Sequence, residues 1–150
     1  MYKAIIGFAV LFLSVGCTTP PVKTVKDPKC RTEIYSLQAK ENAGTKITED
    51  AGLRSEEVAL TIEKHMPQVR RCYETSKLGQ SYNEKRAIQF GFLVRKDGSV
   101  GRTCVEETQT DDIELQACLT QILRTAHFPF PRGGSAVAIS FPFTFETHSR

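Results

Sequence analysis

Apolar positions in the later two-thirds of the chain switch between a helical and a strand period. Residues 55–76 carry an apolar face with spacings of three and four, which is typical of an amphipathic helix. This face consists of Val58, Ile62, Met66, Val69, Cys72 and Tyr73. Pro67 lies inside the pattern, so we predict a kink or a break into two shorter helices, with Ser55 as the N-cap.

Two strands joined by a tight hairpin are predicted next. Residues 88–94 are apolar at every second position, which is the period of a strand with one buried face. Asp97-Gly98 follows, and this dipeptide tolerates the positive φ angles of a tight turn. The partner strand is expected to run from Val100 to about Thr108.

A second helix and a last strand complete the pattern. Thr110-Asp111-Asp112 is expected to cap a helix with the apolar stripe Leu115, Cys118, Leu119, Ile122 and Ala126, which ends near Phe128 because prolines follow. Beyond the Gly133-Gly134 loop, residues 137–145 alternate strictly, and Pro142 marks one side as a free edge. We therefore expect an α+β domain, a three-stranded antiparallel sheet with two main helices packed on one face.

The N-terminus has the pattern of an export signal. Lys3 precedes an apolar run over residues 4–15, which is too short to span a bilayer and fits a signal peptide. The run ends in Leu-Ser-Val-Gly-Cys17, which resembles the lipobox of bacterial lipoproteins. This resemblance implies cleavage before Cys17 and acylation of that cysteine. The alternative is an ordinary secretory cut that leaves Cys17 as a thiol, and both interpretations predict export.

Domain organisation follows from these patterns. Residues 1–16 are expected to form a lipoprotein signal peptide, residues 17–51 a lipid-anchored tether with a poorly ordered segment, and residues 52–147 the folded domain. Residues 18–29 are rich in Pro, Thr and Lys, as in an extended tether. Residues 30–53 are expected to be mainly coil, with room for a short helix or strand. Thr18 after the cysteine suggests sorting to the outer membrane, by general resemblance to lipoproteins.

Charge and polar residues narrow the function. The formal charge of +3 is too balanced to favour nucleic acid as a partner. Basic residues around the end of the first helix form either a solvated face or a contact for anionic polymer or lipid headgroups: Arg70, Arg71, Lys77, Lys85 and Arg86. His65 and His127 do not fall into metal-ligand spacing, and no nucleophile lies beside a base. We therefore expect no metal, no cofactor and no catalysis.

Several segments together resemble a known module. The runs GLRSEEVALTIEKHMPQVRRCYE, KDGSV, ELQACL, HFPFPRGG and VAISFPFTF, over about residues 52–145, resemble the C-terminal domain of the AgmX/PglI family. A more distant resemblance is to the C-terminal domain of TonB-family energy transducers. The resemblance implies the fold given above. Larger members are anchored through the inner membrane and linked to gliding motility or envelope transport, whereas this chain is expected to be the isolated module on a lipid anchor.

Five cysteines in an exported chain suggest disulfides. With Cys17 set aside for lipid, the remaining four allow three connectivities. Cys72 and Cys118 occupy the positions that are paired in the family, so the resemblance implies a bridge between them. The alternative is a pair of buried, reduced thiols. Cys30 and Cys104 depart from the family pattern, and a bridge between them would tie the N-terminal segment to the hairpin.

The expected function is that of a non-catalytic envelope adaptor, lipid-anchored in the outer membrane and facing the periplasm. Its partner would be a protein or an extended peptide that pairs with the edge of the last strand, because unpaired backbone groups there can accept a further strand. The residues expected at this edge are Val137, Ile139, Phe141 and Phe143. The alternative is a structural or peptidoglycan-binding lipoprotein.

Overall fold

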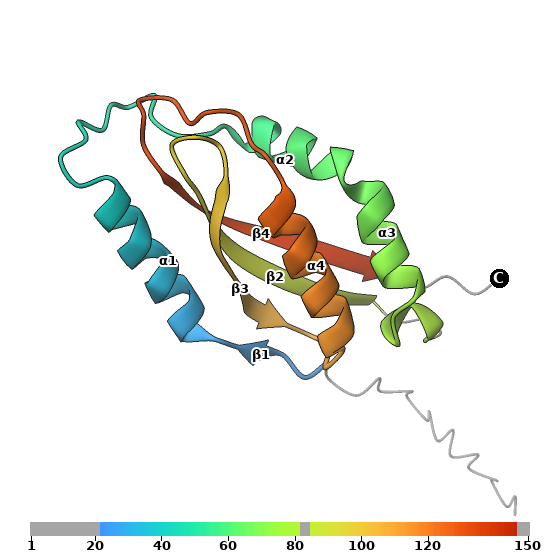
Figure 1. Ribbon diagram of the computed structural model, residues 1–150. Helices are drawn as coiled ribbons and strands as arrows, with labels where there is room; N and C mark the ends of the chain where they lie inside the picture. Colours follow the sequence, from blue (N-terminus) through green and yellow to red (C-terminus); the bar gives the residue numbers. More distant parts are fainter. Residues whose placement is uncertain (1–21, 82–84, 147–150) are drawn as a thin grey trace, which may run out of the picture.

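The computed structural model describes residues 22–81 and 85–146 (Figure 1). The helices are α1 (Pro28–Glu41), α2 (Ser55–Lys64), α3 (Met66–Glu74) and α4 (Ile113–Thr125), with a 3-10 helix, η1 (Leu78–Gln80). The strands are β1 (Val25–Lys26), β2 (Lys85–Val94), β3 (Val100–Thr108) and β4 (Val137–Glu146). They form one antiparallel sheet in the order β1-β3-β2-β4. The α+β class is confirmed, but the sheet has four strands rather than the predicted three.

Strand β2 is the centre of the molecule, since β3 and β4 pair with its two sides. Ile88, Phe90 and Phe92 point from β2 to one face of the sheet and are fully buried there. Leu115 and Leu119 of α4 pack against the same face, so the predicted stripe of this helix contributes to the core. Figure 1 shows α4 lying across the sheet, with α1 and α3 on opposite flanks.

Helix α1 packs on the opposite face of the sheet. The sequence predicts mainly coil for this segment and no helix on this face. Its buried Ile34 meets Leu93 of β2 and Ala136 in a second, smaller apolar cluster. The side chains of Gln38 and Asn42 donate hydrogen bonds to the Ala136 carbonyl at 3.2 and 2.9 Å. The prediction of mainly coil over residues 30–53 holds only after Glu41, because a 14-residue helix precedes it, and the prediction of helices on one face only is wrong.

The helices begin and end within a few residues of the predicted positions. The predicted break at Pro67 is confirmed, because α2 ends at Lys64 and α3 begins at Met66. The N-cap of α2 is Arg54 rather than Ser55, and the Arg54 N–H donates to the Glu57 carboxylate at 2.7 Å. Helix α4 ends at Thr125, earlier than predicted.

Two disulfides tie the helices to the rest of the domain. Cys72 of α3 pairs with Cys118 of α4, and Cys30 of α1 pairs with Cys104 of β3. In the chain-entropy view, closing the 46-residue separation of the first bridge stabilises the fold by about 4 kcal/mol. Cys118 is exposed, whereas Cys30 and Cys72 are buried. The outward position of Cys118 departs from the apolar stripe in which the sequence places it.

The Glu106 carboxylate, which lies between α1 and the sheet, explains why residue 91 in the centre of the sheet is a glycine. Glu106 is the extra residue of a β-bulge in β3, between the pairs Gln89↔Glu107 and Phe90↔Val105. Its carboxylate accepts hydrogen bonds from Arg31 at 3.1 Å and from Ser140 at 2.6 Å. A Cβ atom on Gly91 would lie 2.7 Å from this carboxylate. Glycine at this position therefore lets the carboxylate bridge α1 and β4 across β2.

Asp112 joins the start of α4 to the turn after α3. It is buried, and its two carboxylate oxygens accept from the backbone N–H groups of Leu115 and Leu78, each at 3.0 Å. Burial opposes ionisation, but hydrogen bonds from Leu115, Leu78 and Lys77 together outweigh it, so the pKa of Asp112 lies below its usual value. The ionised group therefore stabilises the fold.

Replacing Asp112 by Ala should lower the free energy of unfolding by about 2 kcal/mol at pH 7, because two backbone donors lose their acceptor. Since the folded pKa is depressed, this contribution is present above the ordinary Asp pKa near ~4 and is lost as the pH falls through the folded value. Urea unfolding at pH 7 and pH 3 measures both effects. Asp111→Ala is the control, because Asp111 is exposed, and an equal loss in this variant would contradict the role of Asp112.

Candidate docking groove at the sheet edge

The backbone of β2 determines which side of β4 is unpaired. Gln109 bonds both backbone groups of Ala87, accepting from its N–H and donating to its carbonyl, so Ala87 directs its backbone toward β3. Because backbone groups alternate along a strand, Ile88 and Phe90 direct theirs toward β4. The register Ile88↔Phe143 and Phe90↔Phe141 runs without interruption.

The outward backbone groups of β4 therefore belong to the even-numbered residues. Odd-numbered residues such as Phe141 and Phe143 direct their N–H and carbonyl groups to β2, so Ser140, Pro142 and Thr144 direct theirs away from the sheet. In the described part of the chain no strand pairs with this outer side. Pro142 sits where its missing N–H costs no ladder bond, as the sequence predicts for an edge.

The residues proposed from sequence for this edge have a different role. Val137, Ile139 and Phe141 are half-buried, and Phe143 is buried in the core. Ile139, Phe141 and Phe143 pack on the core at the α4 face, and alternation along the strand places Val137 on the same face, so all four direct their backbone to β2. These residues belong to the edge strand β4, but they hold the strand in place and leave the outward backbone groups to their neighbours.

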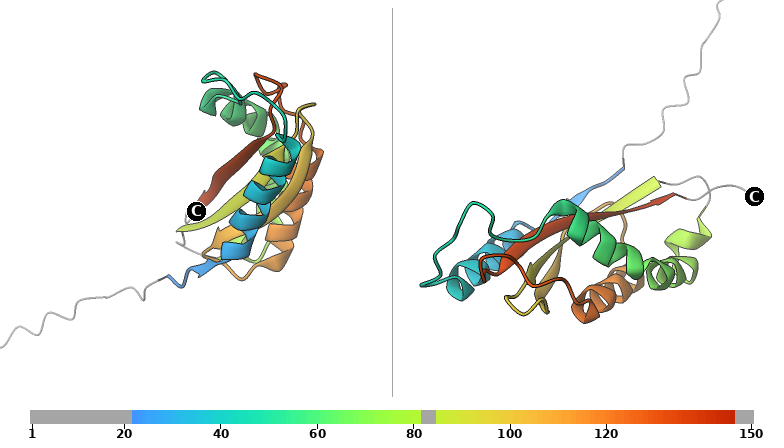
Figure 2. Two further views of the ribbon diagram at one scale, coloured as in Figure 1. Left: turned by 90° about the vertical axis from the view of Figure 1, so that its left-hand side faces the viewer. Right: turned by 90° about the horizontal axis from the view of Figure 1, so that it is seen from above.

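Helices α2 and α3 face the free edge across a groove of about 640 Å³. The helical side contributes Ala59, Ile62, Glu63, Met66, Val69, Arg70 and Tyr73, and the strand contributes residues 141–146. Most of these side chains are apolar, and Met66 is nearly half exposed. Figure 2 shows in its left view that α2 and β4 lie on the same side of the molecule. The edge is thus open to a strand and flanked by an apolar surface.

Tyr73 lies at the inner end of this groove. Its ring stacks on Phe145 with centroids 5.0 Å apart. Its hydroxyl is buried and finds no hydrogen-bond partner among the residues described. Burial raises the pKa of Tyr73, so the hydroxyl keeps its proton at neutral pH. A buried donor without an acceptor costs free energy, so this hydroxyl lowers the stability of the fold at this point.

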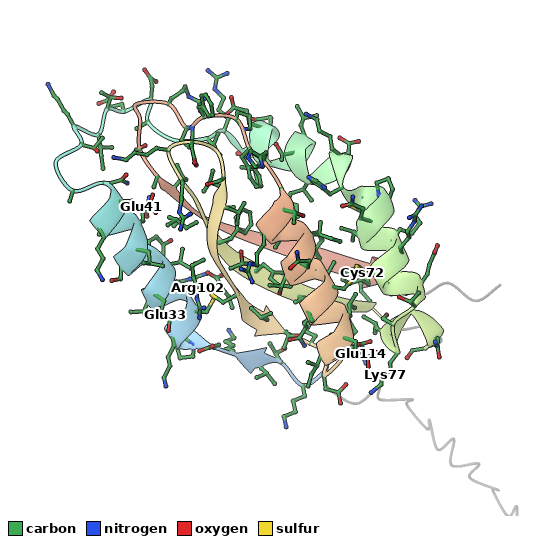
Figure 3. All side chains as sticks on the ribbon, viewed as in Figure 1. Glu33, Glu41, Cys72, Lys77, Arg102 and Glu114 are labelled. Carbon is green, nitrogen blue, oxygen red and sulfur yellow. A yellow bond between two sulfur atoms is a disulfide. The ribbon has the colours of Figure 1, made fainter. Side chains whose placement is uncertain are left out.

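One disulfide and one ion pair fix the positions of α2 and α3, which form the helical side of the groove. The Cys72–Cys118 bridge fixes α3 to α4 with a Cα separation of 5.9 Å. At the other end, the Arg132 guanidinium contacts both carboxylate oxygens of Glu57 at 2.8 and 2.9 Å. The two helices are therefore held at a set distance from β4 rather than packed directly onto its edge. Figure 3 shows Cys72 on the side of α3 that faces α4.

Within residues 22–81 and 85–146, no group of three or more His, Cys, Asp or Glu residues is placed to hold a metal ion. No helix in these ranges has the length and apolar character that crossing a bilayer demands. Cys17 and the signal segment lie outside the described residues.

Comparison with known proteins adds no relative. No protein-family model matches the chain, and no curated protein or solved structure shows significant similarity to it. The resemblance to the AgmX/PglI family therefore stays a prediction.

Amide hydrogen exchange should separate the two sides of β4. The N–H groups of Ser140 and Thr144 face outward and should exchange at least ~100-fold faster than those of Phe141 and Phe143, which are bonded to β2. NMR spectra of the protein transferred into D₂O give the four rates directly. Equal protection of all four amides would show that the outer edge is paired, and would remove the groove as a site for strand addition.

Proposed function

We propose that this chain is an exported lipoprotein, acylated at Cys17, that acts without catalysis as an envelope adaptor. It binds a protein partner by accepting an extended segment at the free edge of β4. The observation that carries this proposal is the unpaired edge next to an apolar groove. The two disulfides support an oxidising compartment outside the cytoplasm.

Strand addition uses both surfaces of the groove. The partner backbone pairs with the outward groups of Ser140 and Thr144, which supplies affinity without reading sequence. Side chains of an added strand alternate in direction, so every second one faces the apolar surface that includes the exposed Ala59 and Met66. The partner segment is therefore expected to be apolar at alternate positions.

Charged side chains at the rim select among such segments. Glu63 and Arg70 line the helical side, and Glu146, which pairs with Lys85, lies at the end of β4. Charges at a rim affect the rate and specificity of association more than its final affinity. A link to motility or envelope transport, which the family resemblance implies, is compatible with such an adaptor.

Thr144→Pro tests the strand-addition mode. It removes an outward N–H and leaves the inward ladder to β2 unchanged, so capture of the partner should fall at least ~10-fold. Thr144→Ala is the matched control, because it removes the side chain and keeps the N–H. The measurement is quantitative recovery of crosslinked proteins on tagged full-length chain from whole envelopes, with circular dichroism to verify the fold of each variant.

The alternative function predicts a different outcome. A structural or peptidoglycan-binding lipoprotein would sediment with purified sacculi, and Thr144→Pro would leave this binding unchanged. A protein recovered equally by the wild type and both variants would also refute the proposed use of the β4 edge.

A further inference from the structure

The end of the domain that leads toward Cys17 exposes apolar side chains. Val22 is the first described residue and is 43 % exposed, Val25 of β1 is 55 % exposed, and Ile113 at the start of α4 is 76 % exposed. Figure 1 shows β1, the start of α4 and η1 at this same end. We call this surface, formed by Val22, Lys23, Val25, Lys77 and Ile113, the tether end. Exposed apolar side chains that gather on one surface mark a site of contact with a protein or a membrane.

A hollow of about 600 Å³ lies in the tether end. Val22 and Val25 line it beside the basic residues Lys23, Lys77 and Arg86. Its acidic lining residues are Asp111 and Asp112, and the Asp112 carboxylate is already engaged by the backbone of Leu78 and Leu115. Figure 3 shows Lys77 close to Glu114 at this end. The tether end therefore combines exposed apolar side chains with lysines, which are the groups that place a surface in a membrane interface, and carboxylates lie beside these lysines.

The sequence leaves little chain between this surface and the anchor. Only residues 18–21, Thr-Thr-Pro-Pro, separate Cys17 from Val22. Even fully extended, the five steps from Cys17 to Val22 reach about 18 Å. An acylated Cys17 lies at the boundary between acyl chains and headgroups, so the tether end cannot leave the neighbourhood of the headgroups. The hairpin lies at the opposite end (Figure 1), and the exposed Phe130 ring lies beside its Gly98.

We propose that the tether end is a membrane-docking surface for the phospholipid layer that holds the anchor. Val22, Val25 and Ile113 enter the headgroup region, and the ammonium groups of Lys23 and Lys77 contact lipid phosphates. This inference rests on the acylation of Cys17 in the proposed function and is independent of the β4 edge. Docking fixes the orientation of the domain, because both the anchor and the adjacent surface contact the same bilayer.

The chain contains no Trp, so single tryptophans report on the two ends separately. Ile113→Trp places the probe in the tether end, and Phe130→Trp is the matched control, since Phe130 is also 76 % exposed. Each full-length variant is purified from membranes and reconstituted into vesicles of phosphatidylcholine and phosphatidylglycerol, with and without bromine on the acyl chains near the headgroups. Bromine should quench most of the emission of Trp at 113 and leave that at 130 unchanged.

Equal quenching at both positions, or none at 113, overturns the docking surface. Intact mass of the same samples tests the anchor separately. If Cys17 carries no acyl group, the anchor proposal fails, and coupling the Cys17 thiol to a maleimide phospholipid restores the geometry for the same quenching measurement. A third variant, Lys23→Glu with Lys77→Glu in the Ile113→Trp background, should weaken the quenching. Unchanged quenching would remove the lysines from the docking surface.

Discussion

The period-two alternation of β2 is the constraint on which the rest of this structure depends. Alternate side chains divide between two faces, so Phe90 and Phe92 enter the main core while Leu93 meets α1 on the other side. Alternate backbone groups divide between two neighbours, so β3 and β4 each receive half of them. Because β4 uses its odd-numbered residues to pair with β2, its even-numbered residues are left at the edge. The core and the candidate site thus follow from one geometric rule.

The sequence predicts the second half of the domain well because its apolar periods are strong. The helical break at Pro67, the hairpin at Asp97-Gly98 and the last strand each follow from local chemistry that tertiary contacts do not change. Residues 28–41 are different: only Cys30 and Ile34 of α1 are buried, so the apolar face is too narrow to predict a helix. What holds α1 is a disulfide and contacts with Glu106 and Ala136, all distant in sequence.

The candidate site shows the same division between local and distant information. That β4 is an edge strand can be inferred from Pro142, whose side chain and missing N–H are local properties. Which backbone groups face outward depends on the register with β2, and register is set by partners elsewhere in the chain. The groove itself depends on where α2 and α3 are held, by Cys72–Cys118 and by Arg132. For this reason the sequence indicates an edge strand but not which of its backbone groups face outward.

Pro142 also limits what the open edge can join. A long strand with unpaired groups is a template for stacking of identical chains, and natural proteins blunt such edges with proline or charge. Here the proline interrupts the outward donors between Ser140 and Thr144, so two copies of β4 cannot form an unbroken ladder with each other. A bound segment must place one of its carbonyl groups opposite Pro142, which has no N–H to donate to it. This restricts the registers in which the segment can pair with β4. The same residue thus protects the chain against fibril-like self-assembly and sets the alignment of whatever pairs with it.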